Sequence, residues 1–407
     1  MNKRWREGNR VLLLENGDEL FPRMLHHIDQ ATHEILLETF IWFDDPAGRK
    51  FKRALVDAAQ RGVWISVLVD GYGSHYLPEA FIAELCEAGV RFHVHDPKPT
   101  WFRVRLNILK RMHCKIMVVD GKVAFIGGIN ISQSQVSDFG AGFKQDYAVE
   151  IRGPVVDDIR NLVQQAAQVY APEQLDFVDL PEIPEPESDT GGLVVRLVTR
   201  DNERHRSDIE QQFLIRMRKA ESHITIANPY FFPGYRMLRE LRRAARRGVK
   251  VRLLVQGQLG SPLAMRAAKT LYDFLVESGV EVYEYRERQL HGKIAAIDDD
   301  WSTVGSSNLD PLSLSLNLEA NVFVIDREFN ELLTKRILSL MHGAKARQVN
   351  ESWIYRRTMI KWLGSFVIYH LSRHFPGFAG WLPPIGPDGK SFADSAALSQ
   401  EENQRDV

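Results

Sequence analysis

The fold follows from RMHCKIMVVDGKVAFIGGIN, Arg111–Asn130, a stretch whose polar residues return later in the chain as LHGKIAAIDDDWSTVGSSN, Leu290–Asn308. Both copies have the form H-x-K-x4-D-x6-G-[GS]-x-N. A repeat of apolar residues would indicate only a common core. A repeat of histidine, lysine and asparagine instead indicates two halves of one active site.

The sequence around the motif is duplicated as well. RGVWISVLVDG, Arg61–Gly71, is matched by RGVKVRLLVQG, Arg247–Gly257, and EAGVRFHVH, Glu87–His95, is matched by ESGVEVYEY, Glu277–Tyr285. Strand-like runs alternate with amphipathic helical runs, which predicts a largely parallel or mixed sheet with helices on both faces. The repeat is too long for a solenoid, so we expect a tandem duplication of one α/β domain.

The motif itself predicts a hairpin. Strands are expected at Cys114–Val119 and Val123–Ile126, and Asp120-Gly121 between them is a strong turn signal. Elsewhere in the first half the apolar periodicity predicts strands at 11–14, 34–43, 63–69 and 90–95, and helices at 20–28, 51–61 and 78–88.

Composition limits the class of protein. The 407 residues have a formal net charge of −1, which argues against a general nucleic-acid binder. Two cysteines form no disulfide framework, which fits a reducing compartment. The N-terminal apolar run is only VLLL, and no window reaches the length of a membrane span, so we expect a soluble or peripheral protein.

We divide the chain into five parts. This division rests on repeat boundaries and composition. The parts are a first domain at 1–170, an acidic Pro-rich linker at 171–192, a second domain at 193–345, a basic aromatic segment at 346–387 and a polar tail at 388–407, expected to be disordered.

The paired motifs have the residues needed for phosphoryl chemistry. On a strand, His113 and Lys115 project to one face, as do His291 and Lys293. An imidazole can attack phosphorus or move a proton near neutral pH, and an ammonium can hold a phosphate oxygen. Two facing histidines therefore suit a two-step displacement in which one forms a phosphohistidine and the other protonates the leaving alcohol. We expect no metal or other cofactor.

Four carboxylates accompany these residues. Asp120 and Asp298 belong to the motif and join our catalytic set, although each sits at a turn, where aspartate commonly caps the backbone. Asp146 and Glu319 follow the two motifs and can each accept a hydrogen bond from a histidine Nδ1, which leaves Nε2 free to attack. The alternative for both is a strand-start carboxylate with no catalytic part.

The double motif resembles that of the phospholipase D superfamily, over roughly residues 8–345. The resemblance implies a two-lobed α/β sandwich with the site between the lobes, His113 as nucleophile and His291 as general acid and base. It also implies a phosphate site made by Lys115, Lys293, Asn130 and Asn308. Gly128 stands where many members have the serine that Ser306 provides in the second copy, so a hydroxyl is missing there.

Within the superfamily, FIGGIN, ANPYFFPG and GSSNLDPLSLSLNLEAN look most like bacterial cardiolipin synthases, and the missing N-terminal spans look like the B type. This implies transfer of a phosphatidyl group between two phosphatidylglycerols at the cytoplasmic face of the inner membrane. Hydrolysis to phosphatidic acid, a phosphatidylethanolamine donor and a glycerol acceptor remain alternatives. Oligomeric state is not indicated.

Two stretches are candidates for contact with an anionic membrane surface. Residues 358–371 have a helical apolar stripe with basic residues on another face, and 99–112 is basic and aromatic and leads into His113. A docked helix and a covering loop are the respective alternatives. His93 and His95 have metal-ligand spacing but no third ligand, and we expect them, like Cys114, to be structural.

Overall fold

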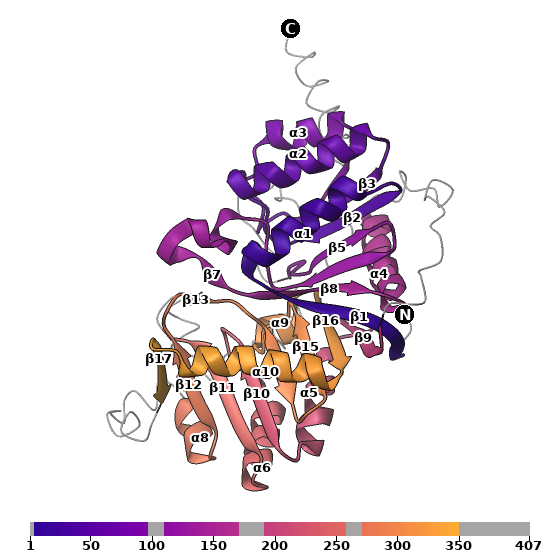
Figure 1. The fold of residues 1–407 in the computed structure, drawn as a ribbon. Coiled ribbons are helices and arrows are strands. Elements are labelled where there is room, and N and C mark those ends of the chain that lie inside the picture. The colour runs from indigo at the N-terminus through magenta and orange to yellow at the C-terminus, as the bar shows by residue number, and fades with distance from the viewer. Residues whose placement is uncertain (1–3, 97–109, 171–190, 258–270, 350–407) are drawn as a thin grey trace.

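The computed structural model describes residues 4–96, 110–170, 191–257 and 271–349 (Figure 1). The first half contains β1 (Arg6–Glu15), α1 (Asn16–Gln30), β2 (Glu34–Thr39), α2 (Pro46–Gln60), β3 (Trp64–Asp70), α3 (Glu79–Glu87), β4 (Arg91–His95), β5 (Lys115–Val119), β6 (Val123–Gly127), the 3-10 turns η1 (Gln133–Gln135) and η2 (Ser137–Gly142), β7 (Lys144–Gln145), β8 (Tyr147–Arg152) and α4 (Val155–Tyr170).

The second half repeats this order. It contains β9 (Leu193–Arg200), α5 (Asp208–Lys219), β10 (His223–Ala227), α6 (Tyr235–Arg246), β11 (Lys250–Gln256), α8 (Tyr272–Glu277), β12 (Glu281–Tyr285), β13 (Gln289–Leu290), β14 (Ile294–Ile297), β15 (Trp301–Gly305), α9 (Pro311–Ser315), β16 (Glu319–Ile325), α10 (Arg327–His342) and β17 (Ala346–Val349).

All the described strands except β7 and β13, which form a two-stranded sheet of their own, belong to one mixed sheet that runs through both halves. Its order is β17-β12-β11-β10-β14-β15-β16-β9-β1-β8-β6-β5-β2-β3-β4, with 15 strands. The halves join where β1 pairs antiparallel with β9. Figure 1 shows the two lobes, one indigo to magenta and one rose to yellow, meeting along this line. The predicted duplicated α/β fold and mixed sheet are confirmed.

Three apolar cores hold the layers together. In the first lobe, α1, α2 and α3 cover one face of the sheet with residues such as Phe21, Phe51 and Leu85. Helices α5, α6 and α8 do the same in the second lobe. The third core lies between the lobes, where α4 and α10 pack with strands of both halves, and β6 and β8 lie against β15 and β16.

The predicted hairpin is confirmed, with Ile116 opposite Ile126 and Val119 opposite Val123. The strand expected at 34–43 is shorter than predicted, because β2 ends at Thr39. Beyond it the Ile41 N–H donates to the side chain of Asn130 rather than to a neighbouring strand. The apolar run therefore continues into a half-buried loop, which periodicity alone does not distinguish from a strand.

Several expectations lie wholly or mostly outside the described residues. These are the linker at 171–192, the aromatic loop at 99–112, the amphipathic stripe at 358–371 and the tail at 388–407. Residues 346–349, which we grouped with the C-terminal segment, form the edge strand β17 on β12, so the sheet extends past residue 345. Among the described helices, none has the length and apolar character to cross a bilayer.

Asp120 and Asp298 anchor equivalent corners of the two lobes. Asp120 has a positive φ of 50° and accepts hydrogen bonds from the backbone N–H groups of Thr32 (3.0 Å), His33 (2.8 Å) and Glu34 (2.9 Å). Asp298, with φ of 51°, accepts from the backbone of residues 221–223. Each carboxylate therefore ties the turn of the motif hairpin to the start of the neighbouring strand.

Replacing Asp120 with alanine should lower the free energy of unfolding by about 1–3 kcal/mol, because three backbone donors lose a charged acceptor. Urea unfolding monitored by circular dichroism measures the change. The matched control is Asp299→Ala, an exposed neighbour of Asp298 in the equivalent turn. Equal stability of Asp120→Ala and the wild type would contradict the capping role.

Candidate active site

The backbone brings each motif histidine against the opposite lobe. The His113 N–H donates to the carbonyl of Leu318 (2.9 Å), and the Leu318 N–H donates to the carbonyl of Arg111 (2.7 Å). In the same way β13 pairs in parallel with β7, and the His291 N–H donates to the carbonyl of Gln145 (2.7 Å). The chain thus aligns each histidine with the residue that follows its backbone partner.

Those next residues are the two predicted supporting carboxylates, and they are crossed between the lobes. His113 Nδ1 lies 3.0 and 3.1 Å from the two carboxylate oxygens of Glu319. His291 Nδ1 lies 2.5 Å from Asp146 Oδ2. Each lobe therefore supplies a histidine to one pair and a carboxylate to the other, so neither lobe contains a complete site.

The pairing fixes the chemistry of both rings. An Nδ1–H that donates to a carboxylate leaves Nε2 as the unprotonated nitrogen of the neutral ring. Burial lowers the pKa of His113 below its usual value, partly offset by Glu319, and burial also lowers the pKa of His291 to about 3. Both rings are therefore neutral at pH 7 in the protein by itself, and each can act as a base or nucleophile.

The two carboxylates stay ionised. Burial would raise the pKa of Glu319, but His113, Lys115 and the Ser306 hydroxyl bring it below the usual value. Burial likewise opposes ionisation of Asp146, but the interactions with His291, Lys293 and the Tyr147 N–H bring its pKa below the usual value. Neutral histidines beside ionised carboxylates gain a proton readily when a further anion enters the site.

We predicted that each histidine and its lysine lie on a strand and project from the same face. In the structure the histidines do not lie on the strands. β5 begins at Lys115 and β14 at Ile294, so both histidines precede their strands. Each ammonium turns back instead: Lys115 Nζ donates to the carbonyl of His113 (2.7 Å), and Lys293 Nζ donates to that of His291. Each charge is nevertheless held close to its histidine.

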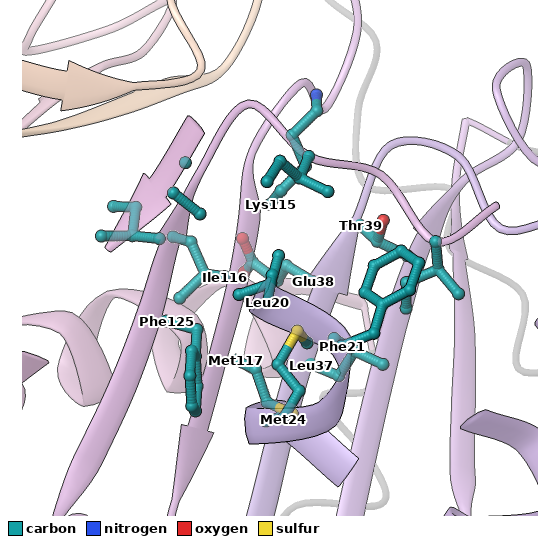
Figure 2. A pocket seen from close by; sticks show the side chains of 15 residues that line it. Leu20, Phe21, Met24, Leu37, Glu38, Thr39, Lys115, Ile116, Met117 and Phe125 are labelled. Atoms are coloured by element: carbon teal, nitrogen blue, oxygen red, sulfur yellow. The ribbon is translucent and has the colours of Figure 1, made fainter. Parts of the chain in front are cut away.

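Burial lowers the pKa of Lys115 to about 7 and that of Lys293 to about 8. One cause is visible below Lys115, where an apolar hollow lies between α1 and strands β2, β5 and β6. Figure 2 shows the Lys115 nitrogen pointing away from the apolar side chains of this hollow, among them Met24 and Phe125. The hollow has room for about one water molecule (20 Å³), so it does not solvate the ammonium.

The difference between Gly128 and Ser306 is explained by the carboxylates. Ser306 Oγ donates to Glu319 Oε2 (2.5 Å), which supports the partner of His113. At Gly128 a Cβ atom would lie 2.3 Å from Asp146 Oδ1, so the carboxylate occupies the space a side chain would need. Position 128 therefore has no room for a serine, because the Asp146 carboxylate fills the space.

The two predicted phosphate-binding asparagines also differ. Asn130 Oδ1 accepts from the Ile41 N–H (3.2 Å), so the NH₂ group of the same amide points away from the Ile41 backbone. Asn308 Oδ1 is buried and has no hydrogen-bond partner among the described residues. In the second lobe Asn228 Oδ1 accepts from the N–H of Leu309, the residue after Asn308 (3.2 Å).

Sequence reasoning missed Phe40. Its ring meets the His113 imidazole at 67° with centroids 4.8 Å apart, and Lys115 Nζ lies 5.0 Å from its centroid. Phe40 directly follows β2, and the residue at the same register in the second lobe is Pro229, so the first half of the site has an aromatic ring where the second has a proline. The only signal in the sequence was its place at the end of a buried strand.

Other predicted residues lie outside this cluster. Asp120 and Asp298 follow the last residues of β5 and β14, at the opposite strand ends from the histidines, and bind backbone as described above. Their inclusion in the catalytic set is not supported by this geometry. Cys114 is buried in the core between the lobes, as predicted. His93 and His95 lie on β4, and burial lowers the pKa of each to about 4.

The chain is similar to known proteins over most of its length. The family model described as "Cardiolipin synthase, PLD-like domain" matches residues 24–168 and 213–341. Cardiolipin synthase B of Escherichia coli (strain K12) is 47% identical over 388 residues, covering 94% of this chain and 92% of the relative. Cardiolipin synthase A of Pseudomonas syringae pv. syringae (strain B728a) is 33% identical over 86% of this chain and 72% of its own.

A solved structure supports the fold. The phosphatidylserine synthase of Haemophilus influenzae Rd KW20 superposes with a TM-score of 0.66, covering 92% of this chain and 95% of that chain. The sequence identity is 14%, so this likeness concerns the fold alone.

Gly128→Ser should lower turnover about 10- to 100-fold, the usual effect of disturbing the partner of a catalytic histidine. The new side chain must displace the Asp146 carboxylate from His291. Turnover per folded molecule, with folding checked by circular dichroism, measures the effect.

The matched control is Ser306→Gly, which removes a hydrogen bond to Glu319 and introduces no clash. It should cost less activity than Gly128→Ser. A Gly128→Ser enzyme with wild-type turnover would contradict the steric role of Asp146.

Proposed function

The chain belongs to the phospholipase D-like cardiolipin synthase family, and on that premise we propose that it joins two phosphatidylglycerols into cardiolipin and releases glycerol. The observation that carries this proposal is the pair of buried imidazoles, each held on a carboxylate of the opposite lobe and each beside a lysine. These are the groups that a two-step displacement at phosphorus requires.

In the first step, His113 Nε2 attacks the phosphorus of one phosphatidylglycerol. A P–N bond forms and the bond between phosphorus and the oxygen of the headgroup glycerol breaks. That glycerol oxygen takes a proton from His291 Nε2, while the diacylglycerol stays on the phosphorus. Because burial lowers the pKa of His291 to about 3, this proton must be taken up as the phosphodiester anion binds, since the anion favours the imidazolium.

In the second step, the glycerol hydroxyl of another phosphatidylglycerol attacks the phosphohistidine. Its proton passes to His291, the P–N bond breaks and cardiolipin leaves. Lys115 and Lys293, with the amide groups of Asn130 and Asn308, are placed to stabilise the charge on the phosphoryl oxygens. Assigning the attack to His113 rests on the family resemblance and agrees with the aromatic ring beside it, which suits the diacylglycerol that stays on the enzyme.

We also propose that the protein acts peripherally at the cytoplasmic face of the bacterial inner membrane. Its proposed substrates are bilayer lipids, and Cys86 and Cys114 are unpaired, as is usual in a reducing compartment. Water in place of the second lipid gives phosphatidic acid, and glycerol in its place returns phosphatidylglycerol. Phosphatidylethanolamine as the donor would form the same phosphohistidine.

Mass spectrometry of products from phosphatidylglycerol vesicles tests the reaction. His113→Ala and His291→Ala should each lower cardiolipin formation at least about 100-fold, the lower end of what a positioned acid or base contributes. His342→Ala, an exposed histidine on α10, is the matched control and should retain activity. Phosphatidic acid as the dominant wild-type product would favour hydrolysis.

The two histidine variants also separate the roles. With a nitrophenyl ester of phosphatidic acid that carries labelled phosphate, a covalent phosphatidyl-enzyme should be trapped on His291→Ala, because nitrophenolate leaves without needing a proton from His291. None should form on His113→Ala. The reverse result would make His291 the nucleophile.

The kcat/KM for phosphatidylglycerol should fall as the pH rises through about 7 to 8, because Lys115 and Lys293 lose their charges over that range in the free enzyme. Lys293→Arg, which stays charged, should move the decline to higher pH. If the decline stays where it was in both Lys293→Arg and Lys115→Arg, the lysines are not its source.

A further inference from the structure

The loop between β3 and α3 exposes a group of rings next to the site. Tyr76 is 73% exposed and Tyr72 40% exposed. The rings of His75 and Tyr76 have centroids 3.7 Å apart, Tyr72 and His75 5.9 Å, and Phe43 and Tyr76 6.5 Å. We call these four residues the aromatic ledge; Phe43, which comes from the segment between β2 and α2, and His75 are half-buried.

Hydrogen bonds hold the fold of the loop. Asp70 Oδ1 accepts from the N–H groups of Tyr72 (2.9 Å) and Gly73 (3.0 Å). Ser74 Oγ donates to the Phe40 carbonyl (3.2 Å) and accepts from the Trp42 N–H (3.0 Å). These hydrogen bonds fix the backbone of residues 72–74, from which the exposed Tyr72 ring projects and which Tyr76 closely follows.

The loop is tied directly to the active site. The second oxygen of Asp70 accepts from the N–H of Met112 (2.9 Å), the residue before His113. Gly73 packs so closely on Phe40 that a Cβ atom would lie 2.1 Å from the Phe40 carbonyl oxygen. Because the Phe40 ring packs against His113, the loop that bears the ledge is attached to the first half of the site through buried contacts.

The chemistry of the ledge suits the boundary of a bilayer. Tyrosine and histidine combine an apolar ring with a polar tip, and such side chains favour the interface between headgroups and acyl chains. The Arg111 guanidinium, which is buried and paired with Asp96 (3.3 Å), lies 4.4 Å from the centroid of the Tyr72 ring and so holds that ring at the inner edge of the ledge.

We propose that the aromatic ledge is a bilayer-docking surface, which seats the first lobe on anionic lipid so that a phosphodiester reaches His113 while its acyl chains stay in the membrane. The proposal rests on the proposed lipid substrate. The attachment of the ledge to the first half of the site favours a bilayer over a protein partner, because the proposed substrate of that site is itself a bilayer lipid.

The double variant Tyr72→Ser/Tyr76→Ser tests the ledge. Sedimentation with vesicles of phosphatidylglycerol and phosphatidylethanolamine should show binding weakened at least about tenfold, because two interfacial rings are removed. The ratio of turnover on vesicles to turnover on dihexanoyl phosphatidylglycerol, a water-soluble substrate, should fall by a similar factor. Tyr76→Trp should keep or strengthen vesicle binding.

Leu332→Ser is the matched control, since Leu332 on α10 is also 40% exposed but lies outside the ledge. It should leave vesicle binding and the turnover ratio unchanged. Unweakened sedimentation of the double variant, or equal losses on vesicles and soluble lipid, would overturn the proposal. A wild-type protein that binds vesicles but transfers no phosphatidyl group would refute the proposed function while leaving the ledge to be judged by sedimentation.

Discussion

The site depends on the crossed pairing of the two lobes. A short backbone contact sets Leu318 beside the residue before His113, and the equivalent contact sets Gln145 beside Leu290. Each contact places the following carboxylate under the Nδ1 of the facing histidine. The continuous sheet through β1 and β9 and the core between the lobes hold this arrangement, so much of the fold serves to fix two hydrogen bonds.

The electrostatics follow from that arrangement. With both histidines neutral, Lys115 and Lys293 balance Glu319 and Asp146, and all four lie out of solvent. A phosphodiester entering such a site brings one negative charge, which favours one added proton and restores full ionisation of the lysines. Proton uptake and substrate binding are therefore linked without a separate acid.

Much of the fold could be read from the sequence, because the duplicated text repeats both the apolar period and the Asp-Gly turn of Asp120-Gly121. The sequence also predicted that His113 and His291 are site residues supported by the carboxylates Glu319 and Asp146. The crossing was not, since nothing in the spacing tells which lobe a carboxylate faces. Phe40 was missed because its contacts depend on a loop that continues an apolar run, and the end of β2 is set by Asn130 rather than by local propensity.

The two half-sites have diverged in matched sets. Gly128 accommodates Asp146 within the first lobe, and Ser306 supports Glu319 within the second, yet each carboxylate serves the histidine of the other lobe. A substitution at Gly128 or Ser306 first changes the packing around the carboxylate of its own lobe. Because that carboxylate binds the histidine of the other lobe, the substitution also changes the environment of that histidine. Recombination that replaced the sequence of one half with that of the other would thus alter the environments of both histidines at once. This requirement keeps the two halves of such a gene from becoming identical.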